Sequence, residues 1–224
     1  MIERTNNMNR AEEDYIKTIY ELLINNNTNI IKNSDLAETM NFTDQSVNEM
    51  VKKLANKDLV VFIPYKGISL TELGKRSAIR LIRAHRIWEV FLMKHLNYSW
   101  HEVHEQAEYL EHINNDDLVN RLYEYIGEPK YCGHGNPIPS YLGVVENKYN
   151  KSLIDYREGE VFILKRVLDN FELLSFLDQE NIKINDSFLI LLIDNFSGYL
   201  KVKNVDSNKE HIITNKISKM IFGL

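Results

Sequence analysis

Four side chains that can bind a metal ion are spaced so that they share one face of a predicted helix. The helix is expected to run from Trp100 to Ile113, and on an ideal α-helix the four residues fall within about 100° of arc. They are His104, Glu108, Glu111 and His112. Divalent ions accept carboxylate oxygen and imidazole nitrogen from such a face. Such a face can also be merely solvated, and spacing alone leaves both interpretations open.

The type of metal chemistry is narrowed by motifs that are absent from the sequence. His85 and Glu89 add a second pair, spaced i, i+4. The string E-Y-L-E-H at 108–112 has Glu where the H-x-x-E-H protease motif needs its first His, and there is no H-E-x-x-H. The single cysteine, Cys132, excludes an internal disulfide and any four-cysteine zinc site. These patterns favour metal binding without hydrolysis, so we do not expect an enzyme.

The first third of the chain has the pattern of a winged helix-turn-helix. Hydrophobic periodicity, capping residues and a Gly-containing turn predict three helices and a β-hairpin. The helices are expected at Arg10–Leu23, from Asn33 or Ser34 to Thr39, and at Asp44–Asn56 behind a Thr43 cap, and the strands at Val60–Pro64 and Ile68–Thr71 around the turn Tyr65–Gly67. We therefore place a DNA-binding domain at residues 1–74.

The third helix carries side chains suited to DNA. In a helix-turn-helix, the residues that begin the recognition helix reach base edges, and nearby lysines contact phosphates. The expected base-contacting residues are Thr43, Gln45, Ser46 and Asn48, and the expected phosphate-contacting residues are Lys52, Lys53, Lys57 and the wing residue Lys66. The same fold also occurs in protein-interaction domains with a solvated polar face, which remains the alternative.

The sequence pattern after residue 74 predicts a helical domain at 75–146 and a small β domain at 152–224. Long amphipathic segments are expected at Thr71–Leu96, Trp100–Ile113 and Asp116–Ile126, followed by a Gly- and Pro-rich loop at 132–139. Short strand-like segments follow at Val161–Leu168, Ser187–Asp194, Tyr199–Val205 and His211–Thr214, with a helical piece at Phe171–Leu177. The fold class is therefore mainly α with a small, partly open β-barrel.

Composition indicates an ordinary globular protein. The 224 residues are 44% hydrophobic and 26% charged. The longest apolar run, Phe188 to Ile193, is far shorter than the roughly 18 to 20 residues that cross a bilayer. The first five residues contain no apolar signal core. We expect a cytoplasmic protein without a membrane segment.

Taken together, the motifs resemble those of the diphtheria toxin repressor and manganese transport regulator family of metal-dependent repressors. The resemblance runs in order over about 200 residues. It is carried by E-D-Y-I-K-T-I-Y-E-L at 13–22, H-R-I-W-E at 85–89, V-H-E-Q-A-E-Y-L-E-H at 103–112 and C-G-H-G-N-P-I-P at 132–139. It implies a winged helix-turn-helix, a helical dimerisation domain and a C-terminal SH3-like β-barrel, acting as a homodimer on operator DNA.

The resemblance also implies a primary metal site and its preferred ion. The ligands would be Asp14, His85, Glu108, Glu111 and His112. Iron-responsive members have Met at the position of Asp14 and Cys at that of Glu108, so the harder ligands here favour Mn²⁺, with Fe²⁺ as the alternative. Zn²⁺ or Cd²⁺ can be expected to substitute in vitro. The two-metal cluster of one manganese subgroup needs a Glu where this chain has Lys17, so that cluster is not expected.

A second site is implied by similarity to three-domain manganese regulators. Its ligands would be Glu89, Cys132, His134 and Asp169. Cys132 could instead be a small buried thiol. His104 matches an ancillary ligand of iron-type members, or it is a surface histidine. The C-terminal segment resembles the SH3-like domain of the family.

A metal switch would also answer the objection raised by charge. The formal net charge of -5 argues mildly against DNA binding, because affinity for DNA comes largely from Lys and Arg. Two Mn²⁺ per chain would bring that charge to about -1. We hypothesise that metal relieves repulsion from DNA as well as fixing domain geometry, since Asp14 lies in the DNA-binding domain and the other primary ligands do not. A metalloenzyme and a metal-independent interaction module are the competing functions.

Overall fold

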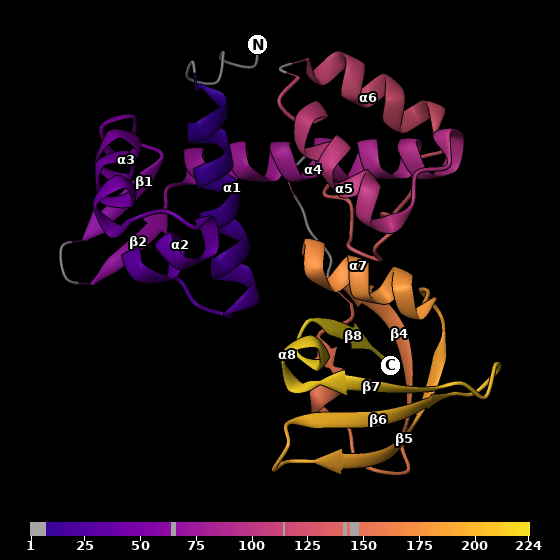
Figure 1. Cartoon of the computed structure of the whole chain (residues 1–224). Coiled ribbons are helices and arrows are strands. Elements are labelled where there is room, and N and C mark those ends of the chain that lie inside the picture. Colours follow the sequence, from indigo (N-terminus) through magenta and orange to yellow (C-terminus); the bar gives the residue numbers. More distant parts are fainter. Residues whose placement is uncertain (1–7, 64–65, 114, 141–142, 144–147) are drawn as a thin grey trace. The chain divides into compact units, whose positions relative to one another are not determined.

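The computed structural model describes residues 8–63, 66–113, 115–140, 143 and 148–224 (Figure 1). The chain divides into two units. Unit 1 comprises Met1–Ala84, Glu111–Ile113 and Pro139–Gly143, and unit 2 comprises His85–Leu110, Asn114–Ile138 and Val144–Leu224. The long helix α4 (Glu72–Leu96) contributes residues to both units. The predicted domain ranges 1–74, 75–146 and 152–224 stay predictions.

Unit 1 contains the predicted winged helix-turn-helix. Its elements are α1 (Arg10–Asn25), α2 (Asn33–Met40), α3 (Asp44–Asn56), β1 (Val60–Ile63) and β2 (Gly67–Leu70). The two strands pair in antiparallel register from Val60↔Leu70 to Ile63↔Gly67. Pro64 and Tyr65, which the sequence assigned to the end of the first strand and to the turn, lie outside the described residues.

Local sequence explains where these helices begin. Asn9 and Glu12 form a reciprocal capping box at the start of α1, and the Thr43 hydroxyl accepts a hydrogen bond from Ser46 N, 3.2 Å away, at the start of α3. The expected Asn33 or Ser34 cap is wrong, because α2 begins at Asn33 and its preceding residue makes no side-chain cap. The apolar faces of the helices meet the hairpin in one core that includes Ile16, Leu36, Val51, Leu54 and Ile68.

Unit 2 contains the second part of α4 together with α5 (Trp100–Leu110) and α6 (Asp116–Tyr125). The prediction that one helix runs on to Ile113 is wrong, because α5 ends at Leu110 and Glu111 and His112 form a turn. The Asn115 side chain then accepts from Leu118 N and begins α6. A single helix face therefore does not carry all four candidate ligands; it carries only His104 and Glu108.

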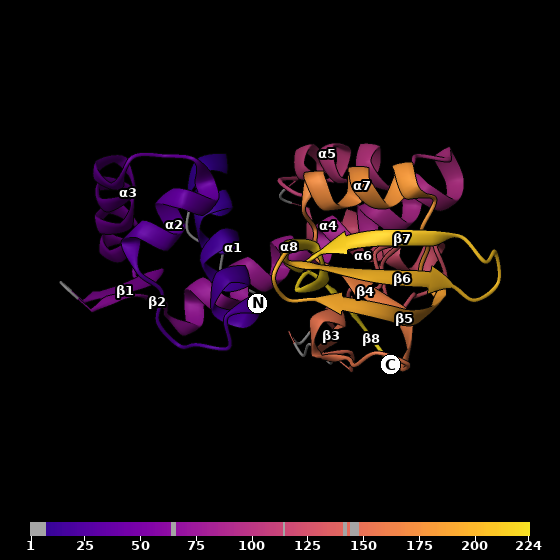
Figure 2. The same ribbon diagram turned by 60° about the horizontal axis from the view of Figure 1, so that its bottom comes forward.

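The C-terminal part of unit 2 is a bent antiparallel sheet with the order β3-β8-β4-β5-β6-β7. Helix α7 packs on its inner face (Figures 1 and 2). The elements are β3 (Lys151–Ser152), a 3₁₀ turn (Leu153–Asp155), β4 (Val161–Val167), α7 (Phe171–Glu180), β5 (Ser187–Asp194), β6 (Tyr199–Asn204), β7 (Glu210–Thr214), α8 (Asn215–Ser218) and β8 (Ile221–Gly223). The fold class predicted from the sequence is confirmed.

Irregular pairing bends this sheet. The register shifts between Leu164 and Arg166 in β4 and between Ile190 and Leu192 in β5, and such bulges increase the local twist of a strand. Strands β3 and β7 are the two ends of the strand order, so the sheet curves without closing. The prediction of a partly open barrel describes this arrangement.

Phe162 is central to the core of the C-terminal sheet. Its side chain is 0% exposed, and its ring meets that of Tyr156 edge to face with the centroids 5.1 Å apart. Replacing Phe162 with Ala should lower the free energy of unfolding by about 3–5 kcal/mol, because the cavity would be lined by strands that cannot collapse into it. Denaturant unfolding measures this, with Phe196→Ala as the control. Phe196 is fully exposed, so its removal should change stability by less than about 0.5 kcal/mol.

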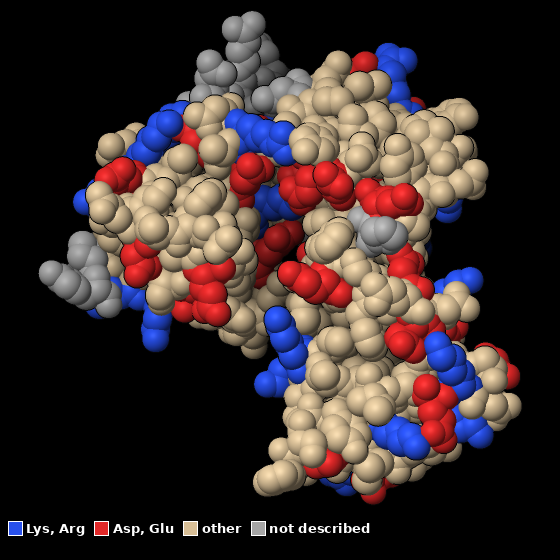
Figure 3. Space-filling view, in the orientation of Figure 1, with Lys and Arg blue, Asp and Glu red and all other residues tan. Residues whose placement is uncertain are grey.

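Among the described residues, no helix is both long and apolar enough to cross a bilayer. Figure 3 shows acidic and basic side chains alternating over the C-terminal sheet on the face it presents, without an extended patch of one sign. The DNA contacts predicted from the sequence lie in unit 1.

Candidate metal centres and DNA-contacting helix

The start of α3 presents most of the predicted DNA contacts to solvent. Thr43, Gln45 and Ser46 are exposed, and Asn48 is half-buried. Thr43 is also the helix cap, and the Gln45 amide donates to Glu49 over 3.3 Å. Lys52 and Lys66 are exposed as well. These side chains are therefore accessible to a ligand in solvent.

The predicted phosphate contacts Lys53 and Lys57 already have an acidic partner inside unit 1. The buried Glu12 carboxylate lies 3.0 Å from Lys53 Nζ and 2.8 Å from Lys57 Nζ. Burial by itself would raise the pKa of Glu12, but the bonds from Lys57, the Asn9 backbone and Lys53 outweigh burial and leave the pKa below its ordinary value. Glu12 therefore ties α1 to the C-terminal half of α3.

The first group of candidate ligands lies in unit 1 and joins Asp14, Glu111 and His112. One donor atom from each lies within 4.8 Å of the others. His112 Nε2 is 3.0 Å from Asp14 Oδ1 and 3.7 Å from Glu111 Oε1. Lys17 Nζ donates to Glu111 Oε2 over 2.7 Å, so Lys17 is an ion-pair partner of a candidate ligand.

Glu13 orients the imidazole of His112. Its Oε2 lies 2.7 Å from His112 Nδ1, and Arg80 lies 3.4 Å from its other oxygen. If Nδ1 carries the proton and donates it to Glu13, the lone pair on Nε2 faces Asp14 and Glu111. A carboxylate that fixes the tautomer of a metal-binding histidine in this way is a common feature of metal sites.

The geometry of this group fits a divalent ion. Two ligands bound at about 2.1 Å and at right angles lie about 3 Å apart, as His112 Nε2 and Asp14 Oδ1 do. Nε2 is buried and, although it is close to Asp14 Oδ1, it is not aligned for a hydrogen bond with any described residue. Burial alone would lower the pKa of His112, but contacts with Asp14 and Glu13 and the charge of Glu111 raise it to about 9. In the absence of metal, a protonated His112 therefore places a positive charge among the carboxylates of Asp14, Glu13 and Glu111.

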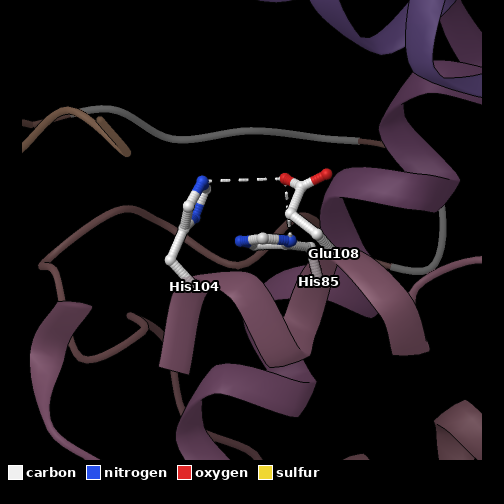
Figure 4. Close-up of side chains that lie close together, drawn as sticks. All are labelled: His85, His104 and Glu108. Carbon is white, nitrogen blue, oxygen red and sulfur yellow. Dashed lines mark ion pairs between the residues drawn. The ribbon is translucent and has the colours of Figure 1, made fainter. Parts of the chain in front are cut away.

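The second group lies in unit 2 and joins His85, His104 and Glu108 (Figure 4). Glu108 Oε1 is 3.6 Å from His85 Nδ1 and 3.8 Å from His104 Nε2, and the two imidazole rings meet edge to face with centroids 5.2 Å apart. Burial, followed by the nearby charge of His85, lowers the pKa of His104. A neutral His104 has a lone pair available for a metal.

Glu89 links the second group to the third, which also lies in unit 2. Its Oε1 is 3.1 Å from His85 Nε2 and 2.8 Å from His134 Nδ1. His134 Nδ1 is in turn 3.1 Å from Asp169 Oδ1, while its Nε2 can donate to Trp100 O over 3.3 Å. Cys132 completes the third group, with its sulfur within 4.8 Å of donor atoms of Glu89 and His134.

The third group also fits a metal ion. His134 Nδ1 is fully buried close to two carboxylates, but it is not aligned for a hydrogen bond with a described residue. Burial would lower the pKa of His134, but Glu89, Asp169 and Cys132 raise it well above its usual value. Burial raises the pKa of the Cys132 thiol to about 12, with Glu89 adding to the effect. The thiol, two carboxylates and an imidazole form a mixed site that borderline divalent ions accept.

The predicted ligands therefore fall into groups within each unit. All four residues of the predicted second site come together, as do Asp14, Glu111 and His112 of the primary site, while His85 and Glu108 are grouped with His104. Sequence reasoning missed the orienting residue Glu13 and the ion pair of Lys17 with Glu111. Both involve residues more than 90 positions apart, so local spacing held no signal of them.

Two family models match most of this chain up to residue 140. Residues 7–68 match the model described as "Iron dependent repressor, N-terminal DNA binding domain". Residues 71–140 match "Iron dependent repressor, metal binding and dimerisation domain". The first range contains α1 to α3 and most of the hairpin, and the second contains most of the candidate metal ligands.

Curated relatives agree with these matches. The chain is 36% identical over 115 residues to an uncharacterized HTH-type transcriptional regulator of Methanocaldococcus jannaschii, covering 51% of this chain and 91% of the relative. It is 30% identical over 181 residues to the diphtheria toxin repressor of Corynebacterium efficiens, covering 78% and 76%. It is 31% identical over 134 residues to the iron-dependent repressor IdeR of Mycobacterium tuberculosis, covering 60% of this chain and 56% of that relative.

Solved structures are similar over almost the whole chain. The manganese regulator SloR is 39% identical with a TM-score of 0.81, covering 94% of this chain and 96% of SloR. ScaR with bound Cd²⁺ is 35% identical with a TM-score of 0.82, covering 94% and 97%. A manganese-dependent transcriptional repressor in complex with manganese is 27% identical with a TM-score of 0.84, covering 95% and 99%. This similarity extends through the C-terminal sheet.

Proposed function

The chain belongs to the diphtheria toxin repressor and manganese transport regulator family of metal-dependent transcriptional repressors, which are not enzymes, and from that premise we propose that Mn²⁺ switches it on. In this proposal the protein binds operator DNA as a homodimer in the cytoplasm and controls genes of metal uptake. The DNA-binding, dimerisation and SH3-like domains span 1–74, 75–146 and 152–224.

The observation that carries the proposal is the orientation of the candidate histidines. His112 and His134 each direct one ring nitrogen to an acceptor outside the ligand groups, the Glu13 carboxylate and the Trp100 carbonyl, and turn the other toward carboxylate oxygens. The two ring nitrogens of His85 face the carboxylates of Glu89 and Glu108. Solvated surface histidines have no reason to be oriented in this way, and the competing interaction-module interpretation would predict no such pattern. The two proposed sites remain those inferred from the sequence, with His104 as an additional ligand.

Ligand chemistry supports Mn²⁺ over Fe²⁺ at the primary site. Its five proposed ligands, Asp14, His85, Glu108, Glu111 and His112, offer oxygen and nitrogen without sulfur, and such hard ligands favour Mn²⁺. The similar structures described as manganese regulators point the same way. The relatives named iron-dependent repressors support the second candidate, an iron-responsive repressor of the same family.

Unit 1 contains the connection by which the primary site can act on α3. Asp14 lies on α1 between two residues that contact α3 or the residues next to it. Glu12 binds Lys53 and Lys57, and the ring of Tyr15 stacks on that of Phe42, just before α3, with the centroids 6.1 Å apart. A bound divalent ion would supply the positive charge that lets carboxylates from α1 and the α5 region share one site. Asp14 would then fix α1, and α3 with it, at the separation that two half-sites require.

The direct test is DNA binding against a series of metals. Operator sequences are first selected from a random library with the full chain and Mn²⁺, and binding is then measured by fluorescence anisotropy with Mn²⁺, Fe²⁺ (anaerobically) and Zn²⁺. We expect DNA binding to require metal. Mn²⁺ should activate DNA binding at concentrations near its dissociation constant for the protein. Light scattering should give a dimer. Activation by Fe²⁺ alone would select the iron-responsive alternative.

Calorimetry with a matched pair of variants separates the metal switch from an interaction module. Glu108→Ala should weaken Mn²⁺ binding by at least about tenfold, since it removes a proposed ligand. Glu105 lies on the same helix, is exposed and belongs to none of the ligand groups, so Glu105→Ala should bind Mn²⁺ normally. Equal affinities for the two variants and the wild type would contradict the proposed primary site.

A further inference from the structure

The buried side-chain amide of Asn136 joins the loop 132–139 to β4 and to the residues that follow it. The side chain is 2% exposed and lies beside the third ligand group within unit 2. Asn136 Nδ2 donates to Val167 O over 2.9 Å and to Asp169 Oδ1 over 3.0 Å. Arg166 Nη1 donates to Asn136 Oδ1 over 3.4 Å. Asn136 is not a candidate ligand, yet it contacts one directly.

These contacts permit only one orientation of the amide. An asparagine amide offers two N–H donors on one side and a carbonyl acceptor on the other. Rotating it by 180° would turn its oxygen toward the Val167 carbonyl and the Asp169 carboxylate, and its NH₂ toward the Arg166 guanidinium. All three contacts would become repulsive, so the amide is held as a donor to Asp169.

The backbone of the loop also contacts β4, on the N-terminal side of Asn136. His134 O accepts from Val167 N over 3.0 Å. Gly135 has a φ of +78°, and a Cβ there would lie 1.9 Å from Lys165 O. Only glycine permits this approach, and it places the Asn136 side chain against the end of β4.

We propose that Asn136 is the positioning residue of the second metal site and holds the Asp169 carboxylate facing His134 in the metal-binding arrangement. Asp169 Oδ1 accepts from Asn136 and lies 3.1 Å from His134 Nδ1. Asp169 lies two residues beyond the end of β4, and without this hydrogen bond its side chain could turn to other rotamers. Asn136 thereby lets the C-terminal domain supply a preformed ligand. This inference rests on the second site proposed above.

The test uses Co²⁺ as a spectroscopic probe with the full chain. Thiolate ligation by Cys132 gives Co²⁺ a near-ultraviolet charge-transfer band, which Cys132→Ser should abolish. Asn136→Ala should weaken the Co²⁺ binding that produces this band by about 10–100-fold, as loss of an orienting partner typically does. Asn120→Ala, on helix α6 and outside the ligand groups, is the matched control and should leave the titration unchanged.

A purely structural role would give a different result. Mn²⁺ binding at the primary site and circular dichroism are measured on the same Asn136→Ala sample, and both should stay close to the wild type. Asn136→Leu, which keeps the branched shape without the donors, should show the same selective loss. An unchanged Co²⁺ band in either variant, or equal losses at both sites, overturns the positioning role. A wild type without the band contradicts the second site itself.

Discussion

Replacing His112 with Gln is expected to weaken Mn²⁺ binding at the primary site by about 100-fold or more. The substitution removes a nitrogen that lies 3.0 Å from Asp14 and is held in place by Glu13. Loss of one ligand from a site of few protein ligands costs more than loss of an orienting partner, whose removal typically costs 10–100-fold. Mn²⁺ binding followed by electron paramagnetic resonance measures the change, and metal-dependent DNA binding should fall with it.

Two matched variants make this result specific to the site. Glu13→Gln keeps His112 but removes the carboxylate that accepts from Nδ1, so it should cost less than His112→Gln, about 10-fold or more. His95 is exposed on α4 and belongs to none of the ligand groups, and His95→Gln should bind Mn²⁺ as the wild type does. If His112→Gln proves no weaker than His95→Gln, His112 is not a ligand.

The sequence predicted those elements whose own pattern is strong. Helix α3 and strand β5 occupy the predicted residues, Asp44–Asn56 and Ser187–Asp194, because a cap or a long β-prone run defines each of them locally. Strand β8 was missed. It has only three residues, Ile221–Gly223, and it is a strand because β3 and β4 bind it on either side. Pairing partners so distant in sequence leave no local pattern.

The candidate site was predictable in chemistry but not in arrangement. Helical spacing placed His104 and Glu108 on one face, and residue type alone indicated hard metal ligands. Hydrophobic periodicity also predicted that the helix would include Glu111 and His112. In the structure α5 ends at Leu110, and these two residues form a turn that places them near Asp14. No spacing rule could show that Glu13 would meet His112, because that contact is created by tertiary structure.

Mn²⁺ affinity at the primary site should rise about 10-fold per pH unit between pH 6.5 and 8.5, about 100-fold in total. The pKa of His112 is raised to about 9, so the metal-free protein holds a proton there across this range. A metal binds only the neutral imidazole, and binding must therefore release that proton. The dependence should flatten as the pH passes about 9.

Stability of the metal-free protein should move in the opposite direction. A raised folded-state pKa means that the folded protein holds the His112 proton more tightly than the unfolded chain does. Its contribution is complete below the ordinary histidine pKa and is lost as the pH rises toward about 9, so the thermal midpoint without metal should fall over that window. Glu13→Gln should reduce both effects, because it removes one of the contacts that raise the pKa.

The second site should show a steeper pH dependence of affinity than the primary site. Both His134, whose pKa is raised well above its usual value, and Cys132, whose pKa is raised to about 12, must lose a proton before they can bind. Co²⁺ titration of the thiolate band should therefore change by up to about 100-fold per pH unit, reflecting two protons released per ion. If the Co²⁺ affinity changes with pH by one released proton or fewer, Cys132 does not bind as the thiolate. At the primary site, an Mn²⁺ affinity that does not change with pH would contradict the role of His112.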